Sequence, residues 1–141
     1  MKNFNNKVAA ITGAASGIGR ALALELAGSG CHLALSDVDE GGLAETAKAA
    51  SAKGVKVTTA KVNVAEREAV YRWADQVVND HGKVNLIFNN AGVALGSSVE
   101  ETSYDDYEWI LGINLWGVVY GTKAFLPYLK QAGEEGHIIN I

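Results

Sequence analysis

Residues 12–20 read TGAASGIGR, and this glycine-rich stretch limits the possible fold more strongly than any other segment. It follows the apolar run 8–11, which has the length of a buried strand, and precedes residues that favour a helix. Gly13 suits a turn with positive φ, Gly17 allows close approach of a ligand, and Gly19 allows the helix to start against the strand. The free N–H groups at such a helix start form a site for a phosphate or pyrophosphate.

Short apolar runs alternate with longer helix-forming segments along the rest of the chain. This alternation predicts one α/β domain over residues 1–141, with a doubly wound parallel sheet and helices on both faces. Pro127, the single proline, is expected to kink the last helix near Leu126 or to end its regular part. The expected strands cover 7–11, 31–36, 56–62, 84–88 and 136–141, and the expected helices cover 18–29, 41–53, 65–81 and 103–132.

Composition excludes several classes of function. A net charge of −4 without a run of basic residues argues against a nucleic-acid surface, and no apolar stretch approaches the ~20 residues that cross a bilayer. The single cysteine, Cys31, fits a reducing cytoplasm and the start of a buried strand, so we expect a core residue rather than a nucleophile. The three histidines, at 32, 81 and 137, lack metal-ligand spacing, and we expect no metal site.

Asp37 ends the second expected strand, about 20 residues after the glycine-rich stretch. A dinucleotide-binding fold places there the acid that binds the adenine ribose hydroxyls. A carboxylate about 4 Å from a 2′-phosphate would be repelled by about 4 kcal/mol at an effective dielectric of 20. The sequence therefore predicts NAD, with NADP disfavoured. The alternative role for Asp37 is capping the next helix, which Asp39 can do equally well.

Polar and small residues follow the later strands. Asn63 could present its side chain to an adenine edge or could simply be a turn residue. Residues 89–92, with the sequence Asn-Asn-Ala-Gly, end the fourth strand, where ligands of open α/β sheets bind. Asn114 lies in an apolar helical setting, where a buried amide needs partners. The predicted cofactor-binding residues are Gly13, Ser16, Gly17, Ile18, Gly19, Asp37, Val38, Asn63, Val64, Asn90, Ala91 and Gly92.

These motifs together resemble the short-chain dehydrogenase/reductase family of NAD(P)-dependent Rossmann-fold oxidoreductases. Thr12-Gly13-x-x-x-Gly17-x-Gly19 resembles that family's cofactor loop, residues 89–92 its sheet-stabilising motif, and Asn114 the asparagine of its catalytic tetrad. The resemblance runs from Lys7 to Ile141. Asn63 departs from it, because the family usually has aspartate there.

The resemblance implies a further catalytic Ser and a Tyr-x-x-x-Lys motif after the fifth strand, and these 141 residues contain no Tyr-x-x-x-Lys. We therefore expect the chain to be the cofactor-binding part of an NAD-dependent oxidoreductase acting on an alcohol/ketone pair, truncated after its fifth strand. The alternative is a catalytically inactive dinucleotide-binding module. An FMN-binding, flavodoxin-like domain is a third possibility, against which Asp37 and residues 89–92 count.

The helix expected over 103–132 carries apolar residues on more than one side, including two tryptophans. One side can pack on the sheet, and the other needs a partner. We expect a homo-oligomer formed through this helix. The segment 93–99 is small and mildly apolar, which fits a modest apolar alcohol or ketone as substrate.

Overall fold

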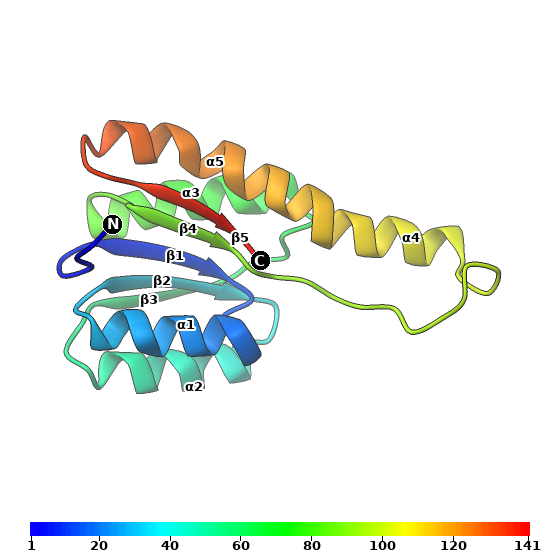
Figure 1. Ribbon diagram of the computed structural model, residues 1–141, viewed down its shortest axis with the longest axis horizontal. Coiled ribbons are helices and arrows are strands. Elements are labelled where there is room, and N and C mark those ends of the chain that lie inside the picture. Colours follow the sequence, from blue (N-terminus) through cyan, green and yellow to red (C-terminus); the bar gives the residue numbers. More distant parts are fainter.

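The computed structural model describes residues 1–141 and contains one five-stranded parallel sheet with the strand order β3-β2-β1-β4-β5 (Figure 1). The order reverses at β1, which pairs with both β2 and β4 and sets Ile11 beside Leu35 and Phe88. The expected doubly wound fold is therefore confirmed. The strands are β1 (Val8–Thr12), β2 (His32–Asp37), β3 (Val57–Lys61), β4 (Leu86–Asn89) and β5 (His137–Asn140).

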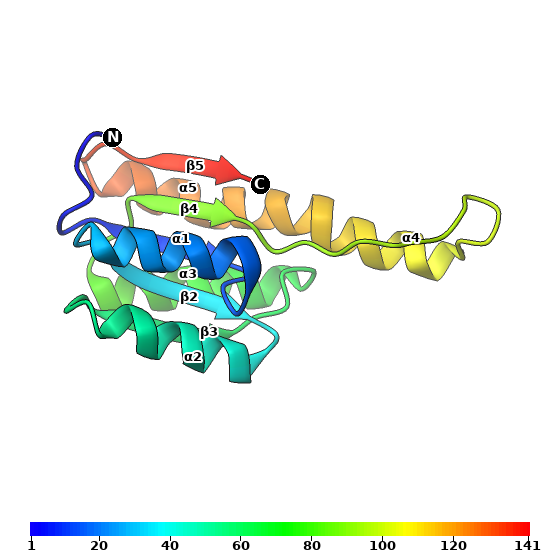
Figure 2. The same ribbon diagram turned by 60° about the horizontal axis from the view of Figure 1, so that its bottom comes forward.

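Helices cover both faces of the sheet. α1 (Gly17–Gly28) and α2 (Glu40–Ser51) lie on one face, and α3 (Arg67–His81) and α5 (Gly117–Gln131) lie on the other (Figures 1 and 2). Successive residues of β1 point to opposite faces, so Val8 belongs to the core under α3 and α5, and Ala9 to the core under α1 and α2. All five β1 residues are buried, as expected for a central parallel strand.

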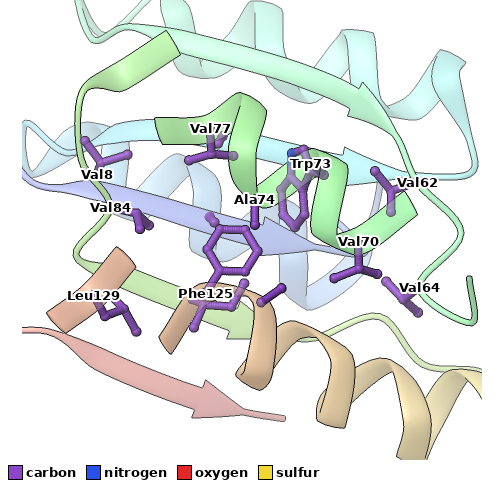
Figure 3. Packing of buried hydrophobic residues seen from close by; sticks show 14 residues of the cluster. Val8, Val62, Val64, Val70, Trp73, Ala74, Val77, Val84, Phe125 and Leu129 are labelled. Carbon is purple, nitrogen blue, oxygen red and sulfur yellow. The ribbon is translucent and has the colours of Figure 1, made fainter. Parts of the chain in front are cut away.

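The core under α3 and α5 is organised around Trp73 and Phe125, whose rings meet edge to face with centroids 5.1 Å apart (Figure 3). Phe125 is completely buried, and both rings belong to one cluster with valines from β1 and α3. This packing fixes α5 against α3 and against β4 of the sheet.

The helix predicted over 103–132 is interrupted. It comprises α4 (Tyr104–Leu111), a π-helical segment η1 (Gly112–Trp116), and α5. Ser103 caps α4 through a capping box with Asp106. α5 continues through Pro127 to Gln131, so of the two effects expected of the proline the end of the regular helix does not occur. The interruption of the segment is η1 instead. α4 buries no residue and extends past the carboxyl ends of the strands (Figure 1).

The remaining elements begin and end within two residues of their predicted bounds. None of the helices combines the length and the apolar character that crossing a membrane requires.

Candidate functional site

A pocket of about 370 Å³ opens at the carboxyl ends of the strands, where β1 and β4 part and the strand order reverses. Its lining contains residues from the β1–α1, β2–α2 and β3–α3 connections and from the segment after β4. All but one of the predicted cofactor-binding residues line it, and Gly19 is the exception. The lining residues from the prediction are Gly13, Ser16, Gly17, Ile18, Asp37, Val38, Asn63, Val64, Asn90, Ala91 and Gly92.

Three further lining residues, Val62, Val93 and Ile113, were not predicted. Each is an apolar residue next to a predicted one in the sequence, at positions 63, 92 and 114. An apolar side chain beside a strand end or in a helix is typical of a core residue. The residue types at these positions therefore gave no indication of a pocket. The predicted residues beside them in the sequence, Asn63, Gly92 and Asn114, were the only available sign.

The glycines shape the floor of this pocket. Gly13 has φ +66°, and a Cβ there would lie 2.8 Å from Ala91 Cα. Gly17 has φ +52° and open space around it, so it leaves room for a ligand. Gly19 is buried behind the loop, where a Cβ would lie 2.1 Å from the Gly13 carbonyl oxygen. The predicted positive φ of Gly13 and the close helix start at Gly19 are thus confirmed.

α1 begins at Gly17, directly on the pocket, and its N-cap residue Ser16 makes no side-chain capping bond. The first N–H groups of an α-helix have no partner within the helix, and they carry a partial positive charge. The first-turn residues that line the pocket, Gly17 and Ile18, therefore offer an anion-binding helix terminus beside the glycine loop.

The Asp37 carboxylate is held by two backbone donors. Ala15 N–H donates to Oδ2 at 2.9 Å, and Asp39 N–H donates to Oδ1 at 3.0 Å. Asp39 caps α2 by accepting from Gly41 and Gly42, so the capping role considered for Asp37 belongs to Asp39. A carboxylate has about four acceptor sites, so Asp37 retains lone pairs for two adjacent hydroxyls of a ligand.

Asn63 lies in the turn after β3 and also lines the pocket. Its Oδ1 accepts from Ala65 N–H at 3.1 Å, and its Nδ2 donates to Glu66 Oε1 at 3.3 Å. The two readings of Asn63 are thus compatible: the side chain stabilises the turn and also stands at the pocket wall.

Asn90 and Thr12 tie the ends of β4 and β1 together. Asn90 Nδ2 donates to the carbonyl oxygens of Thr12 at 2.9 Å and of Gly13 at 3.2 Å. The Thr12 hydroxyl accepts from the N–H groups of Asn90 and Ala91, each at 3.0 Å, and donates to Phe88 O at 3.3 Å. Asn90 therefore braces the two strand ends, and the Thr12 hydroxyl has a matching function that the sequence did not reveal.

Asn114 lies in η1 and clamps the segment after β4. Its Nδ2 donates to Val93 O at 2.8 Å, and its Oδ1 accepts from Val93 N–H at 2.9 Å. The expectation of a buried amide is wrong, because Asn114 is exposed and does not line the pocket. Both of its amide groups are nevertheless satisfied, by one residue of the pocket wall.

The other titratable candidates lie outside the pocket. Cys31 is fully buried, as expected of a core cysteine, and burial raises the pKa of its thiol to about 12. His81 bonds to Thr58 Oγ1, and burial lowers its pKa, with the Lys56 charge adding to the effect. No three His, Cys, Asp or Glu residues are grouped as ligands of a metal ion.

The chain is similar in sequence to known proteins. Residues 7–141 match the family described as short chain dehydrogenase. A Mycobacterium tuberculosis protein named as an oxidoreductase, SadH, is 52% identical over 141 residues, which are 100% of this chain and 51% of that protein. The chain thus spans about half the length of this relative.

Solved structures agree with the fold. A short-chain dehydrogenase/reductase of Burkholderia phymatum in complex with NAD has a TM-score of 0.95 and 43% identity, over 99% of this chain and 50% of that one. An alcohol dehydrogenase of Thermococcus sibiricus with 5-hydroxy-NADP has a TM-score of 0.89 and 35% identity, over 95% and 57%. With the family match over residues 7–141, these similarities confirm the resemblance, and the chain belongs to the short-chain dehydrogenase family of oxidoreductases.

Proposed function

We propose that this chain binds NAD, as the cofactor-binding part of an oxidoreductase that interconverts an alcohol and a ketone. The observation that carries the proposal is the Asp37 carboxylate, held on the pocket wall by the N–H groups of Ala15 and Asp39. It lies in the same pocket as the start of α1 at Gly17. One pocket therefore offers a donor set for a diphosphate and an acceptor for a ribose diol.

Each part of the dinucleotide has a matching part of the pocket. The diphosphate would bind at Ser16, Gly17 and Ile18, where the helix start favours negative charge. The adenosine would lie beside Asp37 and Val38, in the part of the pocket that Val62, Asn63 and Val64 also line. Residues 90–92 would border the second ribose. The nicotinamide itself supplies the hydride chemistry when it is bound, and the protein supplies placement.

Preference for NAD over NADP follows from charge. The Asp37 carboxylate would repel a 2′-phosphate, and no lysine or arginine lines the pocket to compensate. The fold alone does not select between the cofactors, because one structural relative was solved with NAD and another with 5-hydroxy-NADP. The difference must therefore come from individual side chains, of which Asp37 is the one with a formal charge.

Calorimetric titration of the chain with NAD and NADP tests the proposal. We expect NAD to bind at least about tenfold more tightly. Asp37→Asn should weaken NAD binding and strengthen NADP binding. Glu40→Gln is the matched control, because Glu40 is a nearby carboxylate that pairs with Lys61 outside the pocket, and it should leave both affinities unchanged. Absence of NAD binding, or tighter binding of NADP, would refute the proposal.

Turnover is a separate question from binding. A positioned acid/base contributes about 10²–10⁴ in rate, and these 141 residues hold no Tyr-x-x-x-Lys to supply one. We expect the chain to bind NAD but to form no measurable NADH from simple alcohols. The absorbance of NADH measures this. If the protein is instead an inactive dinucleotide-binding module, then the whole protein should also bind NAD without forming NADH. Turnover by this chain that Asn114→Ala abolishes would contradict the expectation.

We further propose that a second copy of the chain packs on the segment 103–132. Trp109 and Trp116 are 48% and 50% exposed, and Leu111 and Leu115 beside them are similarly uncovered. Trp116 stacks on Tyr120 at 5.7 Å, which presents a flat aromatic surface. Sedimentation should detect a dimer that Trp116→Glu converts to a monomer, and a monomeric parent chain would refute this.

Because the one thiol of the chain is buried and unpaired, we propose the cytoplasm as its location.

A further inference from the structure

The Arg20 side chain reaches from the first turn of α1 to α2. Its Nη2 donates to Ala15 O at 2.6 Å and lies 3.2 Å from both Gly42 O and Glu45 Oε2. Its Nε donates to the hydroxyl of Thr46, a buried residue, at 2.9 Å. The guanidinium keeps its charge at all ordinary pH values, so these bonds are of the stronger, charge-assisted kind.

Ala15 connects this arginine to the pocket. Its N–H donates to Asp37 Oδ2 at 2.9 Å, while its carbonyl oxygen accepts from Arg20. Ala15 is buried and therefore cannot exchange these partners for water. The peptide unit that carries the Ala15 carbonyl also carries the N–H of Ser16, which lines the pocket. Arg20 thus holds the backbone on which one support of the Asp37 carboxylate depends.

The first turn of α2 completes the arrangement. Asp39, whose N–H supports the other oxygen of Asp37, caps α2 through Gly41 and Gly42. A Cβ on Gly42 would lie 2.8 Å from Ala15 O, so the two backbones touch without space for a side chain. The carbonyls of Ala15 and Gly42 both face Arg20, which supplies the donors that hold the two backbones in this position.

We propose that Arg20 is a positioning residue that fixes the Asp37 carboxylate, through Ala15 and α2, and so sets the preference for NAD over NADP. The inference rests on the proposed function, because it concerns the residue that selects the cofactor. Arg20 itself does not line the pocket. Without it, Ala15 and the start of α2 can separate, and Asp37 can turn away from the ribose without losing its charge.

The affinities for NAD and NADP separate this role from a general contribution to stability. The two cofactors differ only at the 2′ position of the adenine ribose, so a loosened pocket weakens both equally. A misaligned Asp37 instead weakens NAD selectively and relaxes the repulsion of the 2′-phosphate. In Arg20→Met, which keeps the aliphatic stem, we expect NAD to bind about tenfold more weakly and NADP to change by less than about threefold.

Calorimetric titration with both cofactors, with circular dichroism melting of each variant, provides the test. Arg20→Lys retains the charge but cannot span both carbonyls and Thr46, and it should lower the ratio of NAD to NADP affinity in the same direction. Glu45→Gln is the control, since it removes only the surface ion pair of the same guanidinium, and its ratio should stay within about twofold of the parent.

The outcomes are distinct. Failure of the unmodified chain to bind NAD would overturn the proposed function. A parent chain that prefers NAD, with folded Arg20→Met and Arg20→Lys variants that keep the parental ratio, would overturn only the role of Arg20. Equal weakening of both cofactors, or loss of the folded state in both variants, would show that Arg20 serves stability alone, and the inference would then be wrong.

Discussion

The two ends of the sheet use polar side chains in opposite ways, and β4 shows the contrast within one strand. At its amino end, the Asn85 side chain donates to the Glu134 carboxylate. The same carboxylate forms ion pairs with Lys7 and Lys83. At its carboxyl end, Asn90 bonds to backbone of the β1–α1 turn, and its neighbours face a pocket. The residues at the amino end bond to one another and serve stability, while those at the carboxyl end are held largely by backbone groups and line a pocket that a ligand can enter.

The largest expected effect tests how tightly the carboxyl end is built. Gly19→Ala places a Cβ 2.1 Å from the Gly13 carbonyl oxygen and 2.7 Å from Asn90 Nδ2, so backbone must move. We expect a loss of about 3 kcal/mol in the free energy of unfolding. Chemical denaturation followed by circular dichroism measures this loss. NAD binding should fall with it, because the same shift displaces the glycine loop.

Gly96→Ala is the control for that substitution. Gly96 lies in the segment after β4, has no positive φ, and has open space where a Cβ would stand. Its unfolding free energy should stay within about 0.5 kcal/mol of the parent. If Gly19→Ala were equally harmless, the carboxyl end would be far more yielding than its packing indicates.

The two asparagines that flank β4, Asn85 and Asn90, provide the direct test of the contrast. Asn85 is buried, and its Oδ1 accepts from Val8 N–H at 3.0 Å, so Asn85→Ala leaves a buried donor unpaired. We expect about 2 kcal/mol of destabilisation, with unchanged affinity for NAD in the fraction that stays folded. Asn90→Ala should cost a similar amount, because it frees the carbonyls of Thr12 and Gly13, and should also weaken NAD binding.

Denaturation and calorimetric titration of both variants distinguish the two ends. The contrast requires that only the substitution at position 90 alters affinity. Equal loss of NAD binding in Asn85→Ala would mean that the ends of β4 are coupled, and the division between a stabilising end and a binding end would be wrong.

The carboxyl end was far easier to predict from sequence than the amino end. Glycines at 13 and 19 have few reasons to occur together other than a tight turn against a strand, and both have the predicted geometry. Lys7 and Glu134 are 127 residues apart, and lysines and glutamates occur on every protein surface. Their residue types therefore predicted nothing about their partnership, which depends on how β1, β4 and the α5–β5 turn come together.

Position 114 shows a second limit. The sequence predicted a regular helix there, because a π-helical turn differs from an α-turn by one residue and has no characteristic composition. That extra residue changes which side chains share a face, so the exposure of Asn114 and the place of Ile113 in the pocket could not be derived from helical periodicity.

Acid should weaken the ion pairs at the amino end. We expect this effect on stability to be smaller than those of Gly19→Ala and of the two asparagine substitutions. Lys7 and Lys83 lower the pKa of Glu134 to about 2, from the 4.5 of an unperturbed glutamate. A carboxylate with a lowered pKa contributes stability above its unfolded pKa, and this contribution disappears as the pH falls from about 4.5 towards 2. Glu134→Gln should therefore melt below the parent at pH 7, and the two melting temperatures should converge on acidification.

Glu25→Gln, at an exposed glutamate without an ion pair, should melt like the parent at both ends of this range. A gap between Glu134→Gln and the parent that persists at pH 2 would mean that shape rather than charge holds the amino end, and its contrast with the pocket end would lose its electrostatic basis.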